Sequence, residues 1–174
     1  MSVDSLIVTW KEVRNGFIDE ADQIPADQFS FRATPETRTV TELLQHIIET
    51  QAVLIGEACR PEPNLMRQSF ADHIKEHAPE VAATTDKDGL LALMRTSMDK
   101  AAATIRANEA KLGDSMKRFD GREMTKLDLL RFSASHEMYH RGQLTVYERL
   151  LNIKPALTTK FEKLFAQRAT TATE

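Results

Sequence analysis

The chain has 174 residues, of which 41% are hydrophobic and 28% are charged, as in a folded domain rather than a disordered segment. Lysine and arginine number 23 against 26 aspartate and glutamate residues, so the net charge is −3 and a nucleic-acid-binding surface is not expected. Cys59 is the single cysteine, which excludes an intramolecular disulfide and a cysteine-based zinc knuckle. Because no long apolar run is present and charges interrupt the N-terminal stretch, we expect no membrane span, no signal peptide and a cytoplasmic location.

Apolar residues recur at steps of three and four along four stretches of the chain, which predicts four amphipathic helices. The helices are expected over residues 3–24 and 39–58, from about residue 85 towards Gly113, and over residues 125–152. Prolines follow the first, second and fourth stretches and mark their ends. A shorter helix is expected over residues 160–167, and no β-strand is evident.

Two proline-containing segments separate the predicted helices. Residues 26–38 carry Phe29 and Phe31, whose rings we expect to fold back onto the core. Residues 60–85 are long enough to cross the bundle, so the helices on either side can run parallel. The predicted fold is all-α, a four-helix bundle with a long crossover between the second and third helices. It forms a single domain over residues 1–168, and residues 169–174 are expected to be a disordered tail.

Histidines four residues apart carry the strongest chemical signal in the sequence. His136 and His140 lie about 40° apart on the apolar face of the last predicted helix, at 100° per residue. Two imidazoles one turn apart can share a metal ion, and burying them without partners would be costly. The pattern therefore indicates either a metal-binding pair or two core histidines that are hydrogen-bonded to a carbonyl or to Tyr147.

The segment from His136 to His140 also has the spacing H-E-x-x-H. In zincin peptidases this spacing supplies two zinc ligands and a glutamate that acts on water, so Glu137 is a candidate general base. The extended form of the motif fails, because Gln143 and Val146 occupy its glycine and final histidine positions. Glu162 is a conceivable distant ligand beyond the end of the helix. Without an evident substrate-binding strand, a peptidase is the less favoured interpretation.

The other three histidines carry weaker signals. His46 lies at the edge of the apolar arc of the second predicted helix, where it can face a neighbouring helix or solvent. Taken alone, the pattern around His46 favours a position on the protein surface. His73 and His77 lie in the crossover with few apolar neighbours, so we expect a solvated short helix there, with surface metal capture as the alternative.

Two of these segments resemble a known family. Residues 39–47 read T-V-T-E-L-L-Q-H-I, and residues 136–144 read H-E-M-Y-H-R-G-Q-L. The chain resembles the DinB-like metalloenzyme superfamily of helical bundles over most of residues 3–157, and the second motif is the most specific part of the similarity. The resemblance implies a four-helix bundle, commonly a homodimer, with one divalent metal ion per chain. It implies three histidine ligands, which correspond to His46, His136 and His140.

The same resemblance indicates a class of reaction. Three protein ligands leave a coordination position open, as in catalytic rather than structural sites. Imidazoles suit zinc, nickel, iron or copper, and zinc or nickel is expected first, with iron as a further option. Related enzymes bind a low-molecular-weight thiol at the metal and deliver its thiolate to an electrophile, so S-transfer to a small molecule is the leading expectation. Hydrolysis of a small amide or ester and a non-catalytic metal-binding bundle are the alternatives. The resemblance gives no role to His73, His77 or Glu137, and Cys59 is not expected to be the nucleophile.

Overall fold

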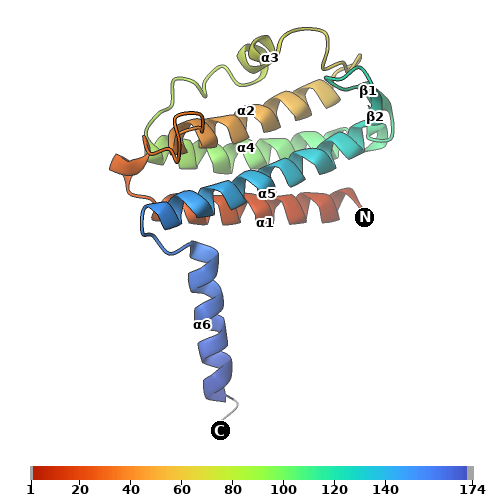
Figure 1. Cartoon of the computed structure of the whole chain (residues 1–174). Coiled ribbons are helices and arrows are strands. Elements are labelled where there is room, and N and C mark those ends of the chain that lie inside the picture. The colour runs from red at the N-terminus through yellow and green to blue at the C-terminus, as the bar shows by residue number, and fades with distance from the viewer. Residues whose placement is uncertain (1, 172–174) are drawn as a thin grey trace.

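The computed structural model describes residues 2–171 and contains a bundle of four long helices (Figure 1). These are α1 (Val3–Gln23), α2 (Val40–Ala58), α4 (Lys87–Ala107) and α5 (Lys126–Leu150). Helix α1 packs against α4 and α5, and α2 packs against the same two helices, so α1 and α2 lie diagonally opposite each other. The predicted four-helix bundle is confirmed, although the third long helix ends at Ala107, before Gly113.

Each long helix is preceded by a residue whose side chain accepts a hydrogen bond from a backbone N–H group of the first turn. These residues are Ser2, Thr39, Asp86 and Thr125. At the start of α2 the bonding is reciprocal, because the Glu42 carboxylate also accepts a hydrogen bond from the Thr39 N–H group at 2.7 Å. Such caps satisfy backbone donors that have no partner inside the helix. The helix starts are therefore encoded locally in the sequence.

The long crossover between α2 and α4 contains a short helix, α3 (Phe70–His77). Figure 1 shows that the crossover lets α2 and α4 run parallel, as expected, while α1 and α5 run in the opposite direction. A hairpin of two short strands, β1 (Ser115–Lys117) and β2 (Glu123–Thr125), precedes α5. The expectation of no strand was wrong here, because three-residue strands are too short to produce a recognisable alternation.

Aromatic and aliphatic side chains fill the space between the helices. Trp10 and Phe17 of α1 are fully buried. Phe29 is buried and Phe31 packs edge-on against the ring of Tyr147, with centroids 5.8 Å apart. The prediction that the segment after α1 folds back onto the core is confirmed.

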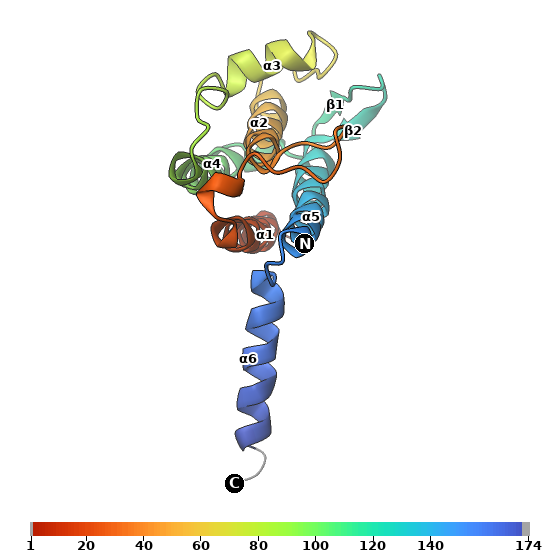
Figure 2. The same cartoon turned by 60° about the vertical axis from the view of Figure 1, so that its left-hand side comes forward.

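Helix α6 (Ala156–Thr171) projects away from the bundle (Figures 1 and 2). It extends beyond both ends of the helix predicted over residues 160–167. Residues 169–171 of the expected tail continue the helix, and residues 172–174 lie outside the described residues. The buried carboxylate of Glu20 accepts hydrogen bonds from the N–H groups of Ala156 and Leu157 and so fixes the start of α6 on α1.

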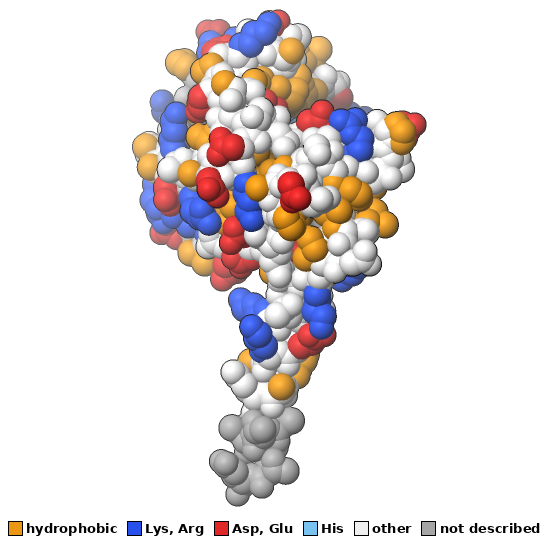
Figure 3. Space-filling model, turned by 90° about the vertical axis from the view of Figure 1, so that its left-hand side faces the viewer, with side chains coloured by type: hydrophobic (Ala, Val, Ile, Leu, Met, Phe, Trp, Pro, Cys, Tyr) orange, Lys and Arg blue, Asp and Glu red, His pale blue; other side chains and the backbone are white. Residues whose placement is uncertain are grey.

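The surface carries charges of both signs. On the face that Figure 3 shows, lysine and arginine side chains are interspersed with aspartate and glutamate. That face therefore offers no extended basic surface of the kind that binds nucleic acid. Within residues 2–171, none of the helices combines the length and the apolar character needed to cross a bilayer.

Candidate metal centre

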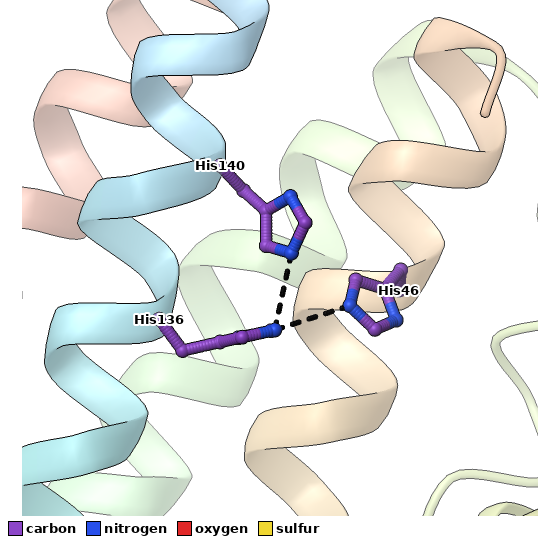
Figure 4. Close-up of side chains that lie close together, drawn as sticks. All are labelled: His46, His136 and His140. Atoms are coloured by element: carbon purple, nitrogen blue, oxygen red, sulfur yellow. Dashed lines mark hydrogen bonds between the residues drawn. The ribbon is translucent and has the colours of Figure 1, made fainter. Parts of the chain in front are cut away.

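Three histidines from two adjacent helices converge at one point of the bundle (Figure 4). His46 comes from α2, and His136 and His140 come from successive turns of α5. The Nε2 atom of His136 lies 3.2 Å from Nε2 of His46 and 3.1 Å from Nε2 of His140. The structure thus brings together the three residues that the family resemblance indicated.

A chain of hydrogen bonds fixes the orientation of His140. Its Nδ1 atom lies 2.9 Å from the amide oxygen of Gln143, and the Gln143 amide nitrogen donates to the Tyr147 hydroxyl at 2.9 Å. The hydroxyl in turn donates to the backbone carbonyl of Arg38, also at 2.9 Å. Because an amide oxygen only accepts, Nδ1 of His140 carries the proton and the lone pair lies on Nε2, which faces the other two histidines. The same arrangement fixes metal-ligating histidines in proteins.

All three imidazoles are held in the neutral form. Burial, assisted by the positive charge of Arg38, lowers the pKa of His46 to about 3. Burial likewise lowers the pKa of His136 to about 4 and also lowers the pKa of His140. Three neutral imidazoles with converging Nε2 atoms form a donor set that fits one divalent cation, because one cation can bind the lone pairs of all three at once.

Two exposed aromatic side chains border the histidines on α5. The Phe132 ring lies 6.0 Å from the His136 ring, and the Tyr139 ring lies edge-on to His140 at 5.1 Å. Phe132 is 52% exposed and Tyr139 is 73% exposed. The edge of the centre therefore offers apolar surface to a small organic molecule.

The glutamate of the H-E-x-x-H spacing points elsewhere. Glu137 is buried, forms an ion pair with Arg14 of α1, and accepts a hydrogen bond from Trp10 Nε1 at 2.7 Å. It does not belong to the histidine cluster, and neither does Glu162, which pairs with Lys154 beside α6 at 2.8 Å. The spacing thus arises without the geometry of a zincin peptidase.

A second cluster joins α3 to α2, and it corrects the expectation that His73 and His77 are solvated. His73 is fully buried, and its Nε2 atom lies 3.2 Å from the carbonyl oxygen of Leu65. His77 Nε2 lies 2.8 Å from the buried carboxylate of Glu57. The prediction of solvated rings was wrong because it rested on the lack of apolar neighbours, whereas His73 is buried and His77 partly buried against the Glu57 carboxylate. Gly56 permits the approach, since a Cβ atom there would lie 2.3 Å from His77 Nδ1.

Arginines already neutralise this second cluster. The Arg67 guanidinium binds both Glu57 and Glu76, and Arg60 binds Glu76 at 2.8 Å. Glu57, His73 and His77 have donor atoms close enough to share a cation, but the Glu57 carboxylate is engaged by Arg67 and His77. We interpret the cluster as the anchor of the crossover on α2.

Cys59 lies at the C-terminal end of α2 and is half-buried. Burial raises the pKa of its thiol, so the thiolate is disfavoured at neutral pH. Because the thiolate is the reactive form, this environment does not favour a nucleophilic role.

A family model described as the DinB family matches residues 1–171. The chain belongs to the DinB family. No curated protein sequence is significantly similar to this family member.

Solved structures with the same fold include other DinB-like proteins. A DinB-like protein from Bacillus subtilis is 23% identical, with a TM-score of 0.64 over 85% of this chain and 92% of that chain. YfiT from Bacillus subtilis, described as a probable metal-dependent hydrolase, is 16% identical, with a TM-score of 0.68 over 87% of this chain and 89% of that one. A mycothiol-dependent maleylpyruvate isomerase is 12% identical, with a TM-score of 0.66 over 83% of this chain. This DinB family chain spans 61% of the isomerase, and the likeness in each case is one of fold.

Proposed function

We propose that His46, His136 and His140 hold one divalent metal ion and that this protein is a metal-dependent enzyme that transfers a low-molecular-weight thiol to a small electrophile. The convergence of three neutral imidazole nitrogens from α2 and α5 carries the proposal. Three protein ligands leave a coordination position for a substrate. Zinc and nickel are the metals that we expect, with iron as a further option, because imidazole suits all three.

A divalent ion in this place would favour the thiolate form of a bound thiol. The protein supplies orientation and an apolar surface. Gln143 holds the tautomer of His140 that leaves Nε2 free, and Phe132 and Tyr139 border the place where an electrophile would lie. In the transfer, a sulfur–carbon bond forms, the leaving group departs with its bonding electron pair, and the thiol proton passes to solvent.

The main alternative is a metal-dependent hydrolase of a small amide or ester. YfiT, which shares the fold, is described as a probable metal-dependent hydrolase, whereas the isomerase of the same fold is described as mycothiol-dependent. The position of Glu137 favours the thiol reaction for this chain. Its carboxylate is bound by Arg14 and Trp10, so it is not free to act as the general base that hydrolysis would need.

Metal analysis of alanine variants tests the assignment of ligands. Bound zinc, nickel and iron per chain are measured in untagged protein after dialysis. We expect the His46→Ala, His136→Ala and His140→Ala variants to lose most of the metal. The His73→Ala and His77→Ala variants should retain it, and equal loss from these two would contradict the assignment.

A screen of small electrophiles then tests the reaction. Turnover that requires added thiol supports S-transfer, whereas turnover without thiol supports the hydrolase. A metal-loaded protein with no exchangeable coordination position would instead indicate a non-catalytic bundle.

The proposal includes a homodimer, which rests on the family resemblance. Light scattering of the full chain at micromolar concentration should give twice the chain mass. A monomer mass under these conditions would contradict it.

A further inference from the structure

An open pocket lies beside the histidine cluster, on the side of α2 that faces the crossover. Its volume is about 620 Å³. The wall is formed by the segment from Arg32 to Arg38, by one face of α2, and by Phe70 and Ile74 of α3. His46 is part of this wall. The pocket and the histidine cluster therefore share one residue, His46.

Arg38 supplies an unpaired positive charge in this pocket. Its side chain is exposed and forms no hydrogen bond or ion pair with any residue that the structure describes, while its carbonyl accepts the Tyr147 hydroxyl. Arg38 lines the same pocket as His46, and its backbone carbonyl ends the chain of hydrogen bonds that begins at His140. These contacts place Arg38 beside the histidine cluster. The other arginine of the wall differs, because Arg32 lies 3.6 Å from the carboxylate of Glu42.

Glu49 supplies the opposite charge. It is half-buried, lies one turn after His46 on α2, and lines the same pocket. Burial raises the pKa of its carboxyl, and the Arg38 charge opposes that rise. Among the described residues, none donates a hydrogen bond to this carboxyl, whereas the Glu42 carboxylate accepts the Thr39 N–H group. The pocket wall therefore carries one cation, Arg38, and one anion, Glu49, that form no hydrogen bond or ion pair with a described residue, although the Arg38 charge acts on both Glu49 and Glu42.

We propose that this pocket binds a small thiol with an amino-acid head group, whose carboxylate binds Arg38, whose ammonium group binds Glu49, and whose sulfur reaches the histidine centre. The inference rests on the proposed function, since it names the class of thiol used at that site. A guanidinium forms paired hydrogen bonds with a carboxylate, and an ammonium group would satisfy a half-buried carboxyl. A thiol with only one of these charges would meet one attractive and one repulsive group, so the pocket selects the zwitterion.

Thiol binding to cobalt-substituted protein tests the inference without an activity assay. Coordination of sulfur to Co²⁺ produces a charge-transfer absorption band. This band is followed while the protein is titrated with cysteine, 3-mercaptopropionate, cysteamine or 2-mercaptoethanol. The variants are Arg38→Gln and Glu49→Gln, with Arg32→Gln as the matched control from the same wall. Comparing one thiol across the variants cancels the differences in acidity between thiols. Cobalt content after each titration shows that the centre is intact, and thermal unfolding shows that the variants are folded.

We expect Arg38→Gln to lower the affinity for cysteine and for 3-mercaptopropionate by about tenfold, which corresponds to the loss of one charge-assisted hydrogen bond at a partly exposed site. The affinity for cysteamine should not fall in this variant. Glu49→Gln should lower the affinity for cysteine and for cysteamine by a similar factor. The affinity for 2-mercaptoethanol should not change in either variant. Unchanged cysteine affinity in both variants would overturn the inference and leave the proposed function standing. If Arg32→Gln lowers the affinity for cysteine as much as Arg38→Gln does, the assignment of the carboxylate to Arg38 is overturned. A wild-type protein that binds none of the thiols would overturn the proposed function itself.

Discussion

Glu137 and Arg14 form a buried ion pair between α5 and α1, and this pair turns the glutamate away from the two histidines that flank it in the sequence. Both side chains are at most 2% exposed. Arg14 also donates to the carbonyl oxygen of Met94 on α4 at 2.7 Å. The Arg14 guanidinium thereby links α1 to both α4 and α5 at the level of the histidine cluster.

The first prediction concerns this pair. Glu137→Gln should lower the free energy of unfolding by about 2–4 kcal/mol, because it leaves the Arg14 guanidinium buried without its counter-charge. Bound metal per chain should stay the same, since the carboxylate is not a ligand. Denaturant unfolding and elemental analysis measure the two effects. Replacing both Arg14 and Glu137 with Met should recover much of the stability, and loss of metal from the Glu137→Gln variant without loss of stability would contradict this interpretation.

The long helices could be predicted from the sequence because local signals define them. Capping residues such as Thr39 and Thr125 mark the starts, and apolar periodicity marks the buried faces. The β-hairpin could not be predicted, because its strands have three residues each. The start of α6 depends on a contact distant in sequence, the capping of its first turn by Glu20. The apolar periodicity of the last 20 residues does not reveal that contact, because Glu20 lies far away in the sequence.

The candidate site was predictable in part. The positions of His136 and His140 follow from the helical repeat, because both lie on the buried face of one helix. His46 alone looked like a surface residue, and only the family resemblance linked it to the pair. The burial of His73 was missed because its partners, Glu57 and the Leu65 carbonyl, lie outside its own helix. Polar contacts between separate segments leave no periodic pattern in the sequence.

The second prediction concerns the support of His140. Gln143→Leu removes the acceptor that fixes the imidazole tautomer, so metal affinity should fall by about 10–100-fold. Competition titration with a chromophoric chelator measures the dissociation constant. Gln45→Leu is the matched control, because the Gln45 amide binds the carbonyl oxygens of Val81 and Thr84 and not a histidine. An unchanged dissociation constant in Gln143→Leu would show that Gln143 has no orienting role.

The third prediction concerns the anchor of the crossover. His73→Ala should destabilise the protein by about 2–4 kcal/mol, because it empties a fully buried site and removes the partner of the Leu65 carbonyl. Metal content should not change. Lys75→Ala, in the same helix but exposed, is the control and should lie within about 0.5 kcal/mol of the wild type. A His73→Ala variant as stable as Lys75→Ala would rule out the anchoring role.

The fourth prediction is the pH dependence of metal binding. An ordinary histidine begins to bind protons near pH 6.5, and proton binding then competes with the metal. Burial lowers the pKa of His46 to about 3 and of His136 to about 4, so this competition should begin only at more acidic pH. Zinc affinity should therefore change little between pH 7.5 and about 5.5. A steep loss of affinity that begins near pH 6.5 would show that the imidazoles titrate like exposed ones.

The fifth prediction concerns Glu148 of α5, beside the Glu20 carboxylate that caps α6. Glu148 is fully buried, and neither of its carboxyl oxygens receives a hydrogen bond from a described residue. Burial and the adjacent charge of Glu20 raise the pKa of Glu148 to about 8. A carboxyl whose pKa is higher in the folded than in the unfolded state stabilises the protein fully only below its unfolded value, near 4.5, and this stabilisation is lost as the pH rises towards 8.

Glu148→Gln should therefore stabilise the protein by about 2 kcal/mol at pH 8, where the buried carboxyl of the wild type must lose its proton on unfolding. The amide stays neutral and can donate a hydrogen bond to Glu20. At pH 4.5 the two proteins should have nearly the same free energy of unfolding, because the wild-type carboxyl is then protonated in the folded state and half protonated in the unfolded state. Urea unfolding at both pH values measures the difference. A gap that does not grow with pH would mean that Glu148 is already ionised in the folded protein at neutral pH.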